Sequence, residues 1–271
     1  MSSSLDEPAV LAPAAALDYP LWLWPNLVGL DAPAVAVVWQ RFLGAAHGVR
    51  VPAGASVALG LVVWGVYLAD RWLDARPDRP AEAADRHRFA RRHRTAVGVA
   101  AVAATLAAGV AALLLPAAYI GTGAAVAVGL VAYMVGVHTV GRSAVGEFGK
   151  AFLVGLLFAA GVVVPLAAER PHEALAWLPA VGAFAAACWL NCRLIAGWEA
   201  PGRDRVAGPL AAAAIALGLA LVAPRPVGLA VACGVVLLLA LHRVRPRVSV
   251  RARRVLADVA LLTPVAFGAV G

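Results

Sequence analysis

Charged residues are scarce in this chain. Only 14% of the 271 residues are Asp, Glu, Lys or Arg, while 62% are hydrophobic. A soluble domain has about 25% charged and roughly 45–50% apolar residues. The apolar excess recurs along the whole chain, and a helix needs about 20 apolar residues to cross a bilayer. The composition therefore excludes an ordinary soluble domain and predicts an all-α integral membrane protein.

Cysteine and early positive charge are also in short supply. The three cysteines, Cys188, Cys192 and Cys233, all lie in apolar runs, which is not the pattern of a disulfide framework or a zinc site. Residues 1–17 contain no Lys or Arg, so they lack the positive start of a secretory signal. We expect residues 1–18 to form a cytoplasmic tail and residues 19–271 to form one transmembrane domain.

Nine apolar runs are separated by clusters of Gly, Pro and charge, which are typical helix breakers. They predict a bundle of nine transmembrane helices. The predicted spans are 30–48, 54–74, 95–115, 118–140, 149–168, 174–198, 206–222, 225–242 and 254–270.

Basic residues alternate between the connections that join these spans. The connections after the second, fourth, sixth and eighth spans, together with the span ends next to them, hold 19 of the 23 Lys and Arg residues. Cytoplasmic loops carry such an excess, so we expect a plasma (inner) membrane protein with its N-terminus in the cytoplasm and its C-terminus on the opposite side. The basic runs at 86–94 and 243–254 are expected to contact anionic lipid head groups, and the charge of +8 does not require nucleic acid as a partner.

Acidic residues at the end of the second span are the strongest candidates for chemistry. Asp70 and Asp74 are four residues apart and therefore share a helix face with Tyr67. Two such carboxylates can hold Mg²⁺, which usually keeps water and a substrate phosphate as further ligands. The alternative is a solvated helix end in which the acids pair with Arg71 and Arg76.

The sixth span ends in a related pattern on the same membrane side. Asn191 and Glu199 are eight residues apart on one helix face, and Asp204 follows. Arg193 lies about two turns inside the span and must face the bundle or extend toward the interface, so it is a candidate phosphate ligand.

The tract Ala69-Asp70-Arg71-Trp72-Leu73-Asp74 resembles the first aspartate-rich motif of the UbiA superfamily of intramembrane prenyltransferases. Members of that family have nine helices, with aspartate-rich motifs at the cytoplasmic ends of the second and sixth, as expected here. The resemblance implies that Mg²⁺ holds the diphosphate of an isoprenyl donor and that a hydrophobic or aromatic acceptor attacks the allylic cation. Val66 and Tyr67 stand where the family motif normally opens with Asn and Asp.

The resemblance also implies roles for individual residues. Metal ligands and catalytic groups would be Asp70, Asp74, Glu199 and Asp204. Diphosphate contacts would be Arg142, Lys150, Arg193, Asn191 and Tyr67. The segment from Ala75 to Thr95 would contain a short helix over the cytoplasmic mouth of the bundle. Outside these motifs, we expect Asp258 to pair with Arg254, four residues earlier.

Two other functions fit the same residues. A UbiA-type terpene cyclase would use the same donor without an acceptor, and its altered ionisation chemistry would suit a second motif with few acids. A transporter or non-catalytic lipid-binding membrane protein would explain the acids missing from the motifs, although a transporter is expected to have polar groups at broken helices in mid-membrane.

Overall fold

The computed structural model describes residues 19–75, 84–139, 142–199 and 207–267, with the side chains of 139, 142–148 and 207 left out. The described part is built of helices alone, in agreement with the predicted fold class. The longer helices are α2 (Asp31–Ala46), α3 (Ala53–Asp74), α5 (Arg94–Leu113), α6 (Ala117–Thr139), α7 (Arg142–Glu169), α8 (Ala174–Glu199), α9 (Ala207–Val222) and α10 (Arg225–Arg243). The shorter ones are α1 (Trp24–Val28), α4 (Asp85–Arg92) and α11 (Val250–Ala260), with 3-10 turns at Leu21–Leu23, Pro171–Glu173, Arg245–Arg247 and Thr263–Phe267.

Six of the described helices are long and apolar enough to cross a membrane, and the bent pair Leu21–Val28 and Asp31–Ala46 makes a seventh if it counts as one span. Large apolar side chains such as Val102, Leu106 and Leu113 remain exposed on their outer faces. Exposed apolar surface on this scale belongs against lipid, where helices satisfy their own backbone hydrogen bonds. The chain is therefore a multi-pass helical membrane protein.

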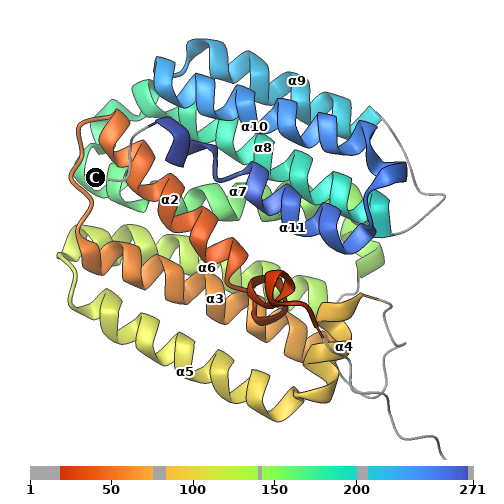
Figure 1. Cartoon of the computed structure of the whole chain (residues 1–271). Coiled ribbons are helices and arrows are strands. Elements are labelled where there is room, and N and C mark those ends of the chain that lie inside the picture. Colours follow the sequence, from red (N-terminus) through yellow and green to blue (C-terminus); the bar gives the residue numbers. More distant parts are fainter. Residues whose placement is uncertain (1–18, 76–83, 140–141, 200–206, 268–271) are drawn as a thin grey trace, which may run out of the picture.

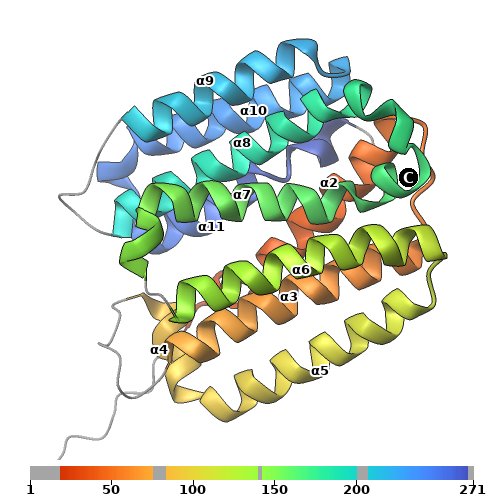
Figure 2. The ribbon, with the colours of Figure 1, turned by 180° about the vertical axis from the view of Figure 1, so that it is seen from behind.

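Helix α8 forms the centre of the bundle. In the apolar stretch of α8 that is long enough to cross a membrane, 67% of the residues are buried. In the corresponding stretch of α6, at the periphery, the share is 6%. Helix α8 packs against α7, α9, α10 and α11, and Figures 1 and 2 show it between α7 on one side and α10 and α11 on the other. In a second group of helices, α3 lies between α5 and α2. The core between the groups includes Trp39 of α2, stacked on Phe184 of α8 with ring centroids 4.4 Å apart.

The last predicted span differs most from the structure. Helix α11 begins at Val250, where the Ser249 hydroxyl caps it by accepting from the Ala252 N–H, and ends at Ala260. Eleven residues rise about 16 Å, roughly half the hydrocarbon thickness. Pro264 opposes a continuous helix because proline lacks an N–H and disfavours the helical conformation of the residue before it. The chain continues instead as a 3-10 turn, Thr263–Phe267.

Candidate functional site

A sharp elbow at the start of the bundle positions the first acidic residue. Helix α1 ends at Gly29, whose φ of +75° is a left-handed conformation that glycine adopts without strain. The chain then turns by 77° into α2. Arg71 of α3 holds this elbow by donating from Nη1 to the Leu27 carbonyl at 2.7 Å. The elbow leaves Asp31 as the first residue of α2.

Asp31 belongs to a polar cluster inside the bundle. Its carboxylate accepts hydrogen bonds from the Asn26 side-chain amide and from the Ala32 N–H. The Asp258 carboxyl of α11 hydrogen-bonds with that of Asp31. On its other side, Asp258 accepts from Asn191 Nδ2 of α8 at 3.0 Å. Four helices, α1, α2, α8 and α11, thus meet through polar side chains.

A layer of ion pairs covers the same end of the bundle. Arg86 of α4 donates to both carboxylate oxygens of Glu199, at 3.0 and 3.2 Å. Arg254 of α11 approaches Glu199 Oε1 to 3.0 Å from the other side. The charge of Arg86 also acts on Asp258 and Arg71, so this layer and the polar cluster are electrostatically coupled.

Helix α4 is the short helix expected in the segment after the second span. Its Phe89 packs edge-on against Tyr19 and Trp24, at centroid distances of 6.2 and 5.9 Å. Its first residue, Asp85, pairs with Arg88 of the same helix and with Arg251 of α11. Helix α4 is therefore attached both to α1 and to α11, and Figure 1 shows it at the end of the bundle where α3 finishes.

The predicted residues of α3 separate into two directions. Asp70 lies beside His138 of α6, with 3.3 Å between its Oδ1 and Nε2 of the histidine. Asp74 is buried, at 8% exposure. Tyr67 packs against the main hydrophobic core and lies within electrostatic range of Asp258 and Asp31.

The predicted residues of α8 and α7 are also divided. Asn191 enters the polar cluster, whereas Arg193 lies against α9, where a Cβ on Gly208 would come within 3.2 Å of its Nε. Two residues correspond to about 200° of helix rotation, which explains why they point apart. Lys150 of α7 acts electrostatically on Cys192, the residue that follows Asn191 in α8. Asp204 and the side chain of Arg142 lie outside the described residues.

The pairing expected between Asp258 and Arg254 is wrong. Arg254 binds Glu199, while Asp258 contacts Asn191 and Asp31. Helix spacing permits an i, i+4 pair, but each residue has a partner on another helix. The three cysteines, Cys188, Cys192 and Cys233, are free in the structure.

Asn26, Asp31 and the inward role of Asp258 were missed from the sequence. One signal was present, because Asp31 is the single charged residue between positions 19 and 40 and stands at the start of an apolar run. Asp258 offered a similar signal, as the one acidic residue in the predicted span 254–270. Asn26 carries no such local signal, and the partners of both residues are brought together only by the elbow and by α11.

Carboxylates suited to a metal are present, but the structure does not gather three of them. Among the described residues, no group of three or more His, Cys, Asp or Glu side chains could hold a metal ion. The arginines Arg86 and Arg254 occupy Glu199. Asp70 and Asp74 carry carboxylate oxygens, the ligand type that Mg²⁺ prefers, and Mg²⁺ is commonly held by one or two carboxylates together with substrate phosphates.

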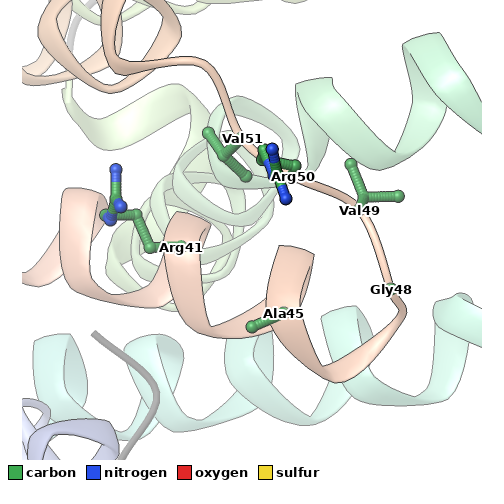
Figure 3. A pocket seen from close by; sticks show the side chains of 6 residues that line it. All are labelled: Arg41, Ala45, Gly48, Val49, Arg50 and Val51. Atoms are coloured by element: carbon green, nitrogen blue, oxygen red, sulfur yellow. The ribbon is translucent and has the colours of Figure 1, made fainter. Parts of the chain in front are cut away.

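A small cavity lies at the opposite end of α2. Its volume is about 280 Å³, and Arg41, Ala45, Gly48, Val49, Arg50 and Val51 line it. Figure 3 shows Arg41 projecting from α2 and Arg50 on the segment that follows it. Fifteen residues of helix separate this end from Asp31, a distance of about 22 Å. None of the site residues predicted from the sequence lines this cavity.

One end of the bundle thus combines ion-paired carboxylates and arginines with a half-buried polar cluster that is electrostatically coupled to them, next to apolar helix faces. Such an arrangement can bind the charged head of an amphiphile while its apolar tail lies among the helices. Comparisons of the chain with protein-family models, with curated proteins and with solved structures give no match in any of the three.

Proposed function

We propose that this protein is an intramembrane, UbiA-like prenyltransferase that transfers an isoprenyl group from a prenyl diphosphate to a hydrophobic or aromatic acceptor. It would have nine spans, the ninth formed by α11 together with the 3-10 turn Thr263–Phe267 that follows it. The observation that carries the proposal is the Arg86–Glu199 ion pair. It brings the arginine-rich α4, which follows the acidic end of α3, onto the acidic end of α8. The sequence resemblance rests on these same two helix ends.

The chain's own residues would divide the work. Arg86 and Arg254 supply guanidinium groups that match diphosphate oxygens in geometry and charge. Asp70 and Asp74 would hold Mg²⁺, which when bound neutralises negative charge on the leaving diphosphate. The apolar helix faces would surround the isoprenyl chain and keep water away from the reacting carbon.

The reaction balances without a redox partner. The bond between the isoprenyl C1 and the diphosphate oxygen breaks, and the diphosphate leaves with the electron pair. A new bond forms between C1 and a nucleophilic atom of the acceptor, which then loses a proton. The positive groups near Glu199 favour this process because they stabilise the charge that develops on the diphosphate.

The test is thermal unfolding of the purified protein in detergent, with farnesyl or geranylgeranyl diphosphate, in MgCl₂ and in EDTA. We expect Mg²⁺-dependent stabilisation, about 2.7 kcal/mol at a ligand concentration 100 times Kd. The double variant Asp70→Asn, Asp74→Asn should lose it. Glu173→Gln is the matched control, because Glu173 is an exposed acid paired with Arg170 outside the predicted site.

Stabilisation that survives in the double variant would move the diphosphate away from α3. Product analysis without an added acceptor separates transfer from cyclisation, since a hydrocarbon or terpene alcohol would identify a cyclase.

The ion pairs of Glu199 favour a second candidate, a non-catalytic protein that binds anionic lipids. The Glu199 carboxylate binds two arginines, Arg86 and Arg254, instead of a metal ion. This function predicts stabilisation by an anionic phospholipid that is equal in MgCl₂ and EDTA, with no turnover of prenyl diphosphate.

A further inference from the structure

Two half-buried carboxyl groups meet between the helices, and among the described residues no positive side chain forms an ion pair with either of them. Asp31 and Asp258, from α2 and α11, are in direct hydrogen-bond contact. The nearby guanidinium of Arg71 donates to the Leu27 carbonyl, and that of Arg86 binds Glu199. Two carboxyl groups at such close range are not both ionised on their own: either they share a proton, or a cation lies between them.

The side chain of Asn191 distinguishes these two possibilities. This residue is only 6% exposed. Its Nδ2 donates to Asp258, which places the amide at the cluster, but its Oδ1 has no hydrogen-bond partner in the part of the chain that the structure describes. A proton shared between Asp31 and Asp258 would leave this buried acceptor unsatisfied, at a cost that native structures generally avoid. A cation beside the two carboxylates would use it as a third oxygen ligand.

We propose that Asp31, Asp258 and Asn191 bind a divalent metal cation, Mg²⁺ or Ca²⁺. Their ligand atoms are all oxygens, which these hard cations prefer. The two carboxylates match the charge of a divalent ion, and the amide oxygen adds a neutral ligand. The ion would join α2, α8 and α11, three helices that are far apart in the sequence. The site uses neither Asp70 nor Asp74, so it does not depend on the proposed prenyl transfer.

Metal binding is measured on the full-length protein in detergent, dialysed against EDTA and then titrated with MgCl₂ or CaCl₂ without any diphosphate. Metal analysis after equilibrium dialysis should find one ion per chain at this site. The Asp258→Asn variant should lose this ion, with Kd raised at least about tenfold, because one ligand charge is gone. The double variant Asp70→Asn, Asp74→Asn and the control Glu173→Gln should keep it.

The apparent melting temperature gives a second, sign-dependent readout. Without metal, Asp258→Asn should be more stable than the unmodified protein, because the amide is neutral, whereas the two adjoining carboxyls must take up a proton to avoid like charges in contact. With metal the order should reverse, because only the unmodified protein gains binding energy. Asn191→Asp adds a third carboxylate and should bind the ion more tightly. Its elution from a sizing column, together with that of Asp258→Asn, verifies that both variants fold.

The proposal is overturned if the unmodified protein binds no ion above the level of Asp258→Asn, or if the melting order does not reverse. Either result would identify Asp31 and Asp258 as a pair that shares a proton. Loss of the ion from the Asp70→Asn, Asp74→Asn variant alone would place the metal at α3 and would also overturn it.

Discussion

The guanidinium of Arg86 makes two hydrogen bonds to the carboxylate of Glu199, which lies 113 residues further along the chain. This contact joins the connection after α3 to the end of α8. The positive charge of Arg86 also acts on Asp258 of the polar cluster. Arginine suits this position because its planar group binds a carboxylate or a phosphate in the same two-pronged geometry. A diphosphate could therefore exchange with Glu199 for the same arginine.

The strength of this ion pair can be measured by a double-mutant cycle. Arg86→Gln, Glu199→Gln and the double variant should give a coupling energy of about 0.5–1 kcal/mol, because both side chains are partly exposed, at 20% and 25%. The measurement is the unfolding midpoint in mixed detergent with increasing SDS. The Arg170–Glu173 pair, which is more exposed, should couple by about 0.5 kcal/mol or less. Equal coupling in both pairs would show that the two-pronged geometry adds nothing.

Close packing between α9 and α10 gives a second prediction. A Cβ on Gly228 would lie 2.4 Å from the Ala220 carbonyl oxygen, so Gly228→Ala must push the two helices apart. We expect a loss of about 1–3 kcal/mol in the free energy of unfolding. Small residues allow such contacts between membrane helices. Gly218→Ala, with nothing within 4 Å of its new Cβ, is the control and should be neutral or gain up to about 1 kcal/mol from helix propensity. Similar losses in the two variants would contradict the packing shown here.

Trp39 connects α2 to the segment after α11. Its Nε1 donates to the Leu261 carbonyl at 2.6 Å, and its side chain is 1% exposed. Trp39→Phe retains most of the stacking on Phe184 but leaves that carbonyl without its donor, which should cost about 1–3 kcal/mol. Thermal unfolding measures the loss. Trp22→Phe, at a site that is 49% exposed, should stay within about 0.5 kcal/mol of the unmodified protein. An unchanged Trp39→Phe variant would mean that this bond adds nothing to stability.

Helix positions were accessible from the sequence because hydropathy and helix breakers are local signals. The predicted spans 54–74, 174–198 and 225–242 agree within one residue with α3, α8 and α10. The elbow at Gly29 was not predicted, because its angle is stabilised by Arg71 from another helix. The early end of α11 was also missed, although Pro264 and the polar Arg-rich first turns offered a signal.

The site was predicted only in outline, and the reason is tertiary. Spacing along α3 placed Tyr67, Asp70 and Asp74 on one face, but it cannot tell which helix that face meets. In the structure, Asp70 lies beside His138 of α6, whereas Tyr67 lies within electrostatic range of Asp258 of α11. Likewise, Asp31 gains its significance from α11, more than 200 residues later. Local patterns identify the helix ends that carry charge, while the pairing of those ends depends on the packing of the whole bundle.

The arrangement of the helices across the membrane leads to a labelling prediction. In a variant with Cys188, Cys192 and Cys233 replaced by Ala, single cysteines are introduced by Arg92→Cys, His172→Cys and Arg247→Cys, all at exposed positions. A membrane-impermeant maleimide added to spheroplasts should label His172→Cys at once, because it follows α7 on the predicted outer side. The other two should react only after permeabilisation, since basic connections remain in the cytoplasm. Full labelling of all three in detergent verifies that each thiol is reactive.

Helix α9 has 16 residues, a length of about 24 Å. If α9 did not cross the membrane, five crossings would separate Arg92 from Arg247 instead of six. Arg247→Cys would then be labelled from outside, and the predicted count of nine spans would be wrong.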